Sequence, residues 1–468
     1  MGGEVFGNDP KNIRLGEIVC IDGHGGVYQH HAEKGGDSQS FSECSHGDRK
    51  GTERGSCYTA GLVLSMAILL CHFWFFWVPA VPLHFPPFKI EWDTIRWRHS
   101  ARMRCIYIMN LVDLLSQPCP WLLDTGEEND IVIGCRIRLM RNLVGFPFPI
   151  RATEQDRYAV QRTVQQAAKE LFTADNYYFT DIQLLPPLDR EYLMERQLIS
   201  QELVLTEQAH ALLIDRQEQF CVIVNEEDHI QIHAAGSGLA PQSVWEQVNQ
   251  IDDLLASKLD YVFHEKYGFL TSSIATVGTG MKIYAMLHLP ALVIVSEMDK
   301  VARSLQKKNL IIRGLYGEGN RAYGDFFLVS NRITLGKSEE ELVAKMTDLI
   351  PQIVAFERQA RSFLVTNRRD IILDRCSRSV GVLRTAQTIN CVEAMLHLSN
   401  IRLGIHTGLL QGLDISTINL LLLHSLPAHI QMVYRQKEPD AELSQAEQDV
   451  VRATYIRQRI NESAPSSL

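Results

Sequence analysis

Two short runs of alternating apolar residues on either side of an acidic turn constrain the fold of this chain more than any other feature. Apolar residues occupy every second position at Phe220, Val222 and Val224, and the same alternation resumes at 230–232. A period of two is typical of β-strands. The residues between the runs, 225–229, read NEEDH. We therefore expect two sheet strands that present carboxylates where the chain turns.

Helical patterns follow these strands. Apolar residues recur at helical spacing from Trp245 to Phe263, which predicts a long amphipathic helix. Residues 326–335 have the pattern of a further strand, and a second helical stripe runs from Leu342 to Phe356. After about residue 338 the pattern is helical almost throughout. The expected fold class is α+β, with an antiparallel sheet flanked by helices followed by an all-helical C-terminal domain.

Residues 1–108 have a different composition from the rest of the chain. They carry 11 acidic and 11 basic residues, so the net charge of −9 arises within 109–468. They also contain an apolar run at 61–78, which is just long enough for a short membrane span, and four arginines that follow it would favour a cytoplasmic C-terminal side. Three interpretations stay open: a dispensable extension before Met109, which we favour, a membrane tether, or a buried or partner-binding element.

Composition and motif searches exclude several classes of function. A net charge of −9 gives no electrostatic reason to expect nucleic acid as a partner. The ten cysteines form no close CxxC pair, so we expect no metal site, and scattered free thiols suit a reducing compartment such as the cytoplasm. No GxxxxGK[ST] motif occurs, which excludes a P-loop.

Cationic side chains stand beside several predicted loops. Arg136 and Arg138 lie in GCRIRLMRN, Lys282 follows the glycine-bearing loop 271–282, and Arg313 begins RGLYGEGN. The planar fork of arginine suits polyphosphate oxygens, and several such forks can bind a nucleotide without a P-loop. The glycines alone are weak evidence, since most glycine loops are plain turns.

Carboxylates in two separate turns suggest a cationic substrate. Glu226, Glu227 and Asp228 fall at the end of the predicted strand, and Glu318 lies in a glycine-framed turn. Two carboxylates can hold one planar guanidinium, and one of them can take the proton that leaves before a guanidine nitrogen attacks phosphorus. An acidic cluster by itself is more often a solvated turn. The cationic loops and Glu318 together favour the functional interpretation.

Five blocks of the sequence carry a family resemblance. DIVIGCRIRLMRN, NEEDHIQI, VGTGMKIYAMLHLPAL, IIRGLYGEG and NRITLGKSEEE occur in order and resemble the ATP:guanido phosphotransferases, most closely the bacterial McsB-type protein-arginine kinases. The resemblance covers about 109–468. It implies a catalytic domain at 131–360 and a helical domain at 361–468 that serves in dimerisation and phosphoarginine binding. It further implies ATP as substrate, with Mg²⁺ bridging the nucleotide phosphates.

The resemblance also assigns site residues. The residues it places in catalysis are Glu227, Glu318 and Ser273. Those it places at ATP are Gly134, Cys135, Arg136, Ile137, Arg138, Gln197, Gln231, Lys282, Ile283, Tyr284, Ala285, Met286, Arg313, Gly314, Leu315, Tyr316, Gly317 and Glu318. Those it places in a phosphoarginine-binding-like motif are Gln448, Asp449, Arg452 and Ala453.

Several positions depart from the family pattern. Gln231 and Lys282 stand where arginines are expected, Gln197 replaces a histidine, and Ser273 takes the place of a reactive cysteine. Gly134-Cys135 replaces a pair of serines, and the motif at Gln448 has lost its first arginine. Each lost charge-assisted bond costs about 1.5–3 kcal/mol, which is roughly 10- to 150-fold in binding.

Three functions therefore remain in competition. The first is a protein-arginine kinase with altered activity, which we favour because Glu227, Glu318 and the three arginines are retained. The second is a pseudokinase that binds phosphoarginine or regulates a partner. The third, a kinase of free arginine, would need an amino-terminal helical domain that 1–108 does not resemble. The partners that the resemblance implies are proteins with exposed arginines, an AAA+ unfoldase and protease, an activator protein and a second copy of the chain.

Overall fold

The computed structural model describes residues 19–21, 27–29, 114, 118–173, 176–315, 322–438 and 441–463. The chain divides into two units, Met1–Ile90 and Glu91–Leu468. In the first unit the strands β1 (Val19–Ile21) and β2 (Val27–Gln29) pair in antiparallel fashion. The apolar run at 61–78 lies outside the described residues. Among the helices that the structure describes, none combines the length and the apolar character that crossing a bilayer requires.

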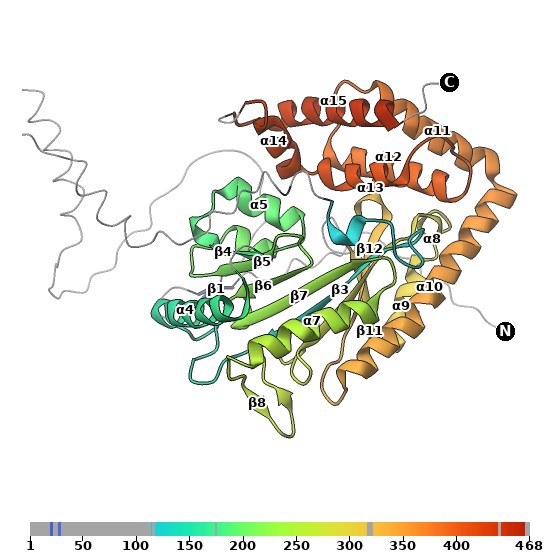
Figure 1. Cartoon of the computed structure of the whole chain (residues 1–468). Helices are drawn as coiled ribbons and strands as arrows, with labels where there is room; N and C mark the ends of the chain where they lie inside the picture. The colour runs from blue at the N-terminus through green and yellow to red at the C-terminus, as the bar shows by residue number, and fades with distance from the viewer. Residues whose placement is uncertain are drawn as a thin grey trace, which may run out of the picture. The chain divides into compact units, whose positions relative to one another are not determined.

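The second unit is built on an antiparallel sheet of eight strands, with the spatial order β11-β12-β10-β3-β7-β6-β5-β4 (Figure 1). The turn 225–229 joins β6 to β7, and these two strands pair as the sequence predicts. The strands are β3 (Val132–Arg141), β4 (Tyr177–Asp181), β5 (Ala211–Asp215), β6 (Phe220–Val224), β7 (Ile230–Ser237), β10 (Met281–His288), β11 (Leu310–Gly314) and β12 (Phe326–Asn331).

β12 ends earlier than the strand expected at 326–335. The side chain of Asn331 ends the ladder, because its amide oxygen accepts from the backbone N–H of Ile283 and its amide nitrogen donates to the carbonyl of Met281. The hydroxyl of Thr334 then donates to the carbonyls of Ala275 and Val277. These bonds direct the chain past residue 331 toward the 271–280 loop.

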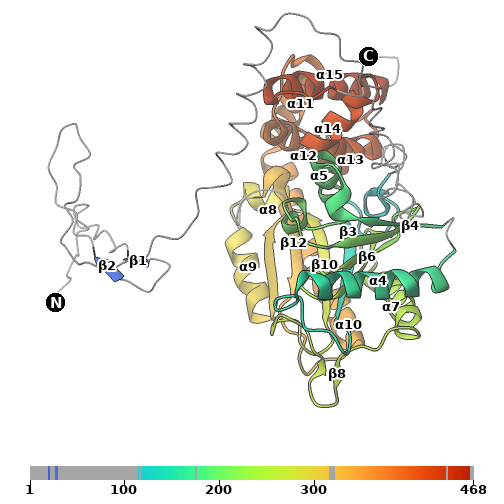
Figure 2. The same cartoon turned by 90° about the vertical axis from the view of Figure 1, so that its left-hand side faces the viewer.

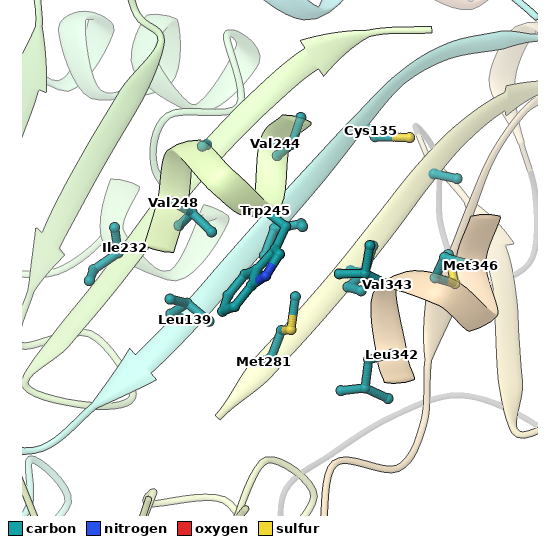
Figure 3. Packing of buried hydrophobic residues seen from close by; sticks show 14 of the residues in the cluster. Cys135, Leu139, Ile232, Val244, Trp245, Val248, Met281, Leu342, Val343 and Met346 are labelled. Atoms are coloured by element: carbon teal, nitrogen blue, oxygen red, sulfur yellow. The ribbon is translucent and has the colours of Figure 1, made fainter. Parts of the chain in front are cut away.

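The main hydrophobic core covers one face of this sheet. Side chains at every second position of β3, such as Cys135 and Leu139, meet Trp245 and Val248 of α7 (Pro241–Ala256). Figure 3 shows these residues together with Met346 from α10 (Glu339–Asn367). Since successive strand residues point to opposite faces, the alternate positions of the same strands project away from this core.

Further helices lie beside the sheet, and α4 and α7 are both visible there in Figure 2. Besides α7 and α10, they are α4 (Glu154–Leu171), α5 (Pro187–Glu195), α6 (Gln201–Val204), α8 (Pro290–Ile294) and α9 (Met298–Lys307). Short 3₁₀ turns lie at η1 (Pro120–Leu122), η2 (Ile182–Leu184) and η3 (Tyr323–Asp325).

The helix predicted to run to Phe263 is too long, since α7 ends at Ala256. The backbone beyond it pairs with a distant segment instead, because Val262 donates its N–H to the carbonyl of Asn142. Phe263 belongs to β8 (Phe263–His264), which pairs with β9 (Gly268–Phe269) and leaves Phe263 59% exposed.

The second predicted helix, from Leu342 to Phe356, is confirmed as part of α10, which a capping box of Ser338 and Glu341 begins. Its predicted apolar stripe is buried at Leu342, but Phe356 is 51% exposed. Phe356 lies in a groove of about 770 Å³ between α8, α9 and α10 rather than in the core.

Five further helices lie together at one end of the sheet (Figure 1 and Figure 2). They are α11 (Arg369–Thr385), α12 (Cys391–His406), α13 (Ile415–His424), α14 (Pro427–Arg435) and α15 (Gln445–Ser463). Four of them share a second core with η1 and η3, whereas Ala428 and Met432 of α14 pack in a third cluster with Tyr192 and Leu193 of α5. The antiparallel sheet with helices and the helical C-terminal region confirm the predicted fold class. The predicted boundary between 360 and 361 falls inside the continuous helix α10, so it stays a sequence prediction.

Candidate active site

The face of the sheet opposite the main core carries charged and polar side chains. Arg136 and Arg138 alternate with the core residues of β3. Arg138 is opposite His233 on β7 and Lys282 on β10, and Arg136 is opposite Tyr284. Strand alternation and register together therefore gather polar side chains from distant parts of the sequence on one surface.

A cleft of about 1250 Å³ opens on this surface. Its lining includes Arg138, Arg313, Gln197, Gln231 and Glu227 from among the residues predicted from the sequence. A smaller cavity of about 40 Å³ lies beside it and is lined by Arg136, Arg138, Gln197, Tyr284, Met286, Arg313 and Leu328. The structure thus brings the predicted nucleotide arginines and the acid Glu227 into one region.

The guanidinium of Arg138 is suited to an anion. Its Nε atom is buried and has no hydrogen-bond partner among the described residues. Its central carbon lies 5.5 Å from the ring centroid of Tyr284, which orients the group by a cation–π contact. A buried donor without a partner is costly, and a phosphate oxygen in the cleft would satisfy it.

At the acidic end of the cleft, Glu227 and Ser273 are neighbours. Burial and the adjacent Asp228 raise the pKa of Glu227, while a hydrogen bond from the Ser273 side chain lowers it. Burial lowers the pKa of Lys282, whose ammonium donates to the carbonyl of Asn331 at 3.0 Å. A carboxylate with a raised pKa is a better proton acceptor near neutral pH.

Asp228 holds the two loops of this acidic end together. Its Oδ1 atom accepts from the side-chain amide of Asn142 at 2.6 Å and from the backbone N–H of Ser272 at 2.6 Å. Asn142 in turn accepts from the backbone N–H of His229 at 3.0 Å. The Asp228 carboxylate is therefore used in fixing Ser273 beside Glu227, a role that spacing along the sequence does not indicate.

Two neutral amides stand at the nucleotide side of the cleft. The Oε1 atom of Gln231 accepts from Nε2 of His233 at 3.3 Å, and Oε1 of Gln197 accepts from Nη1 of Arg136 at 3.3 Å. Burial and the two arginines hold the pKa of His233 well below its usual range. His233 was missed in the sequence, although it lies two residues after Gln231 and so on the same face of β7.

Several residues predicted to contact ATP point away from the cleft. The side chains of Cys135, Ile137, Ile283 and Ala285 lie in the main core with at most 1% exposure. Their assignment to ATP stays a prediction, but their burial excludes contact through these side chains, because consecutive strand residues cannot all face one ligand. Gly134 has no room for a side chain, since a Cβ there would lie 2.7 Å from the carbonyl of Gly236.

The remaining predicted nucleotide residues lie at the end of β11. Gly314 is its last residue, and Leu315 lines the large cleft. Tyr316, Gly317 and Glu318 fall outside the described residues. The convergence of Glu227 and Glu318 on one guanidinium therefore stays a prediction.

The C-terminal motif forms part of the second core. Arg452 is fully buried, donates to the carbonyls of Ser425 and Ile389 at 2.7 and 3.0 Å, and pairs with Asp449. Ala453 is also buried, and Gln448 donates to the carbonyl of Leu443 at 3.4 Å. Most of the bonding capacity of Arg452 is thus used to hold α15 to its neighbours, and its role in binding phosphoarginine stays a prediction.

Comparison with known families gives two matches along the chain. The model of the ATP:guanido phosphotransferase C-terminal catalytic domain matches residues 159–360. The model of the protein-arginine kinase McsB C-terminal domain matches residues 369–467. Together they cover the helical region and all of the eight-stranded sheet except β3, which precedes the first match.

Similar curated proteins extend over most of the chain. The protein-arginine kinase of Halothermothrix orenii is 35% identical over 354 residues, which cover 75% of this chain and 100% of that protein. That of Symbiobacterium thermophilum is 38% identical over 347 residues, covering 73% and 96%. Among solved structures, the crystal structure of a lombricine kinase is 22% identical, with a TM-score of 0.45 over 52% of this chain and 72% of that chain. This chain belongs to the protein-arginine kinase branch of the ATP:guanido phosphotransferase family of enzymes.

Proposed function

We propose that this protein transfers the γ-phosphoryl group of ATP to a guanidine nitrogen of arginine side chains in other proteins. The observation that carries the proposal is the composition of one cleft, in which Arg138 and Arg313 lie with Glu227. This reaction needs binding groups for both of its substrates: cations for the phosphate oxygens of ATP and a carboxylate for the guanidinium.

The reaction requires one proton to leave the substrate. A free guanidinium is protonated at neutral pH, and its nitrogen becomes a nucleophile only when that proton is removed. We assign the removal to Glu227, whose pKa is raised chiefly by burial. The N–P bond then forms, the bond from the γ-phosphorus to the bridging oxygen breaks, ADP leaves, and the proton resides on Glu227. Glu318 is expected to be the second carboxylate at the guanidinium.

The cationic side chains neutralise the phosphate charge. Arg138 offers an Nε that no described residue bonds, and Arg313 lines the same cleft. Mg²⁺ bound to the nucleotide phosphates supplies further charge neutralisation. The described residues offer no cluster of three or more His, Cys, Asp or Glu for a metal ion. Glu226, which lines the cleft and has a buried Oε2 without a partner among those residues, is suited to face a hydrated Mg²⁺.

Incubation of the full chain with Mg-ATP and an arginine-rich protein tests this proposal, with acid-labile phosphate on the protein as the readout. We expect incorporation by the parent and none by Glu227→Gln, which cannot accept the proton. Glu207→Gln, an exposed substitution outside the cleft lining, should behave as the parent. Labelling that is absent at high ATP, or that survives in Glu227→Gln, would contradict the proposal.

A second candidate function is a binding module without activity, and the amides at the nucleotide side favour it. Gln231 and Gln197 offer hydrogen bonds without charge, so the site lacks cations that the family pattern supplies. If this candidate is right, Gln231→Arg with Gln197→His should create labelling that the parent lacks. If the kinase is active but weakened, the same variant should lower the ATP concentration at half-maximal rate about tenfold or more.

The other expectations drawn from the resemblance stay proposals. They are arginine-bearing protein substrates, an AAA+ unfoldase and protease, an activator protein, a homodimer and a cytoplasmic location.

A further inference from the structure

The end of α5 carries three successive residues that bind three different parts of the molecule. Glu195 contacts the first turn of α14, Arg196 pairs with Glu218, and Gln197 contacts Arg136 on β3. Figure 1 shows α5 lying next to α14 at the boundary between the sheet region and the C-terminal helices. This short segment therefore connects the helical region to the nucleotide side of the cleft.

Glu195 binds the N-terminus of α14 tightly. Its Oε1 accepts from the backbone N–H of Ala428 at 2.8 Å, and its Oε2 accepts from that of His429 at 2.9 Å. The same Oε2 lies 2.7 Å from Nδ1 of His429. The first backbone N–H groups of a helix have no partner within the helix, so a buried carboxylate there satisfies donors that would otherwise be unpaired. Burial raises the pKa of Glu195 to about 8.

Arg196 fixes the next position in the chain. Its side chain is fully buried, and its Nε lies 2.9 and 3.1 Å from the two carboxylate oxygens of Glu218. Glu218 lies in the turn between β5 and β6. Together, Glu195 and Arg196 attach the end of α5 to the helical region on one side and to the sheet on the other.

Gln197 is the residue at which the chain leaves α5, so its position follows that helix end. Its φ angle is +66°, as in a Schellman cap. The cap bonds are present, since the backbone N–H of Gln197 donates to the carbonyl of Met194 at 2.8 Å and that of Leu198 donates to the carbonyl of Leu193 at 2.9 Å. The amide oxygen of Gln197 reaches Nη1 of Arg136 at 3.3 Å, and both side chains line the small cavity beside the main cleft.

We infer that Glu195 is a positioning residue for the nucleotide site: by binding the first turn of α14, it holds Gln197 where its amide orients Arg136. The helical region thereby contributes to nucleotide affinity through the end of α5, in addition to Cys391, Leu426 and Pro427, which line the large cleft themselves. The inference rests on the proposed function, since it takes the cleft as the site of ATP. Removal of the Glu195 carboxylate frees the end of α5, lets Gln197 shift with it and leaves Arg136 less well placed.

A double-mutant cycle tests whether Glu195 acts on the nucleotide site through Gln197. Mg-ADP binding to the full chain is measured by calorimetry for the parent, Glu195→Ala, Gln197→Ala and the double variant. We expect each single variant to bind roughly three- to thirtyfold more weakly, and the double variant to bind no more weakly than Gln197→Ala alone. Losses that add in the double variant, or an unchanged affinity in Glu195→Ala, would overturn the inference.

Two further variants separate positioning from a general loss of stability. Asp414→Ala removes the N-cap of α13 within the helical region, where the carboxylate of Asp414 accepts from the backbone N–H of Thr417 at 3.1 Å, and Asp414 lines neither the cleft nor the small cavity. This variant should lower the melting temperature while Mg-ADP affinity stays at the parent value. Glu195→Gln keeps one acceptor for α14 and should weaken binding in the same direction as Glu195→Ala but less, which preserves the test if Glu195→Ala fails to fold. Weakening by Asp414→Ala equal to that by Glu195→Ala would overturn the inference.

Mg-ADP binding by the parent protein distinguishes a failure of this inference from a failure of the proposed function. If the parent does not bind Mg-ADP, the proposed function fails and the inference fails with it. If the parent binds Mg-ADP and the two losses are additive, only the inference fails.

Discussion

Arg138 in the cleft and Arg452 in the helical region come from sequence blocks that both resemble functional motifs, yet the fold uses them differently. Arg138 stands over Tyr284 with a buried Nε that has no partner among the described residues. Arg452 has no exposed surface, and it donates to Ser425, Ile389 and Asp449. A motif arginine can bind a ligand only with donors that the fold has not already used. Each side chain has a buried donor without a partner among the described residues, Nε of Arg138 and Nη2 of Arg452, so the difference is access: Arg138 lines a cleft that a ligand can enter, whereas Arg452 is enclosed in the helical region.

The largest expected effect concerns the stability of the helical region. Arg452→Ala removes a buried ion pair and leaves two backbone carbonyls and Asp449 without their donor, so the free energy of unfolding should fall by about 3–5 kcal/mol. Chemical denaturation measures this. Gln448→Ala, which loses one long bond at 3.4 Å, is the matched control and should cost about 1 kcal/mol or less. Unchanged stability in Arg452→Ala, combined with lost phosphoarginine binding, would assign this arginine to the ligand rather than to the fold.

The cleft arginine should show the opposite pattern. Arg138→Ala removes a cation from the phosphate side, so kcat/KM for protein labelling should fall about 100- to 1000-fold, with a small change in melting temperature. Arg378→Ala is a suitable control, because its ion pair with Asp374 lies on the surface of α11 and contributes little. If Arg138→Ala unfolds the protein and Arg452→Ala does not, the contrast between the two arginines is reversed.

Local patterns predicted much of the sheet because strands and their turn are encoded by nearby residues. The pair of strands around 225–229 follows from period-two alternation, and the gathering of Arg138, Gln231 and Lys282 follows from the family blocks. The end of α7 could not be predicted in this way. Helical spacing continues to Phe263, but the backbone of Val262 pairs with Asn142, which lies far away in the sequence.

The site features that the sequence left open have the same origin. The family pattern assigns 134–138 to ATP as one stretch, and the alternation of β3 places the side chains of Cys135 and Ile137 in the core. The burial of Arg452 depends on Ser425 and Ile389, which sequence spacing does not bring near it. Period two could have identified His233 beside Gln231. No local signal indicates that Glu195 binds α14, because its partners lie more than 230 residues further along the chain.

The smallest expected effects concern the acidic end of the cleft, where Glu227 must be deprotonated to accept a proton. Activity should therefore fall as the pH falls through the pKa of Glu227. The hydrogen bond from Ser273 lowers that pKa, and the charge of Glu202 raises it. Ser273→Ala should move the acid limb of the pH–rate profile to higher pH, and Glu202→Gln should move it to lower pH.

These opposite shifts separate a role in tuning Glu227 from mere damage to the site. A variant that only disturbs the loop lowers kcat at every pH and leaves the position of the acid limb unchanged, whereas loss of a neighbouring hydrogen bond or charge displaces the limb. Because the cationic side is untouched in both variants, KM for ATP should stay near the parent value. Shifts in the same direction for Ser273→Ala and Glu202→Gln would show that the acid limb reports another group, and Glu227 would lose its assignment as the proton acceptor.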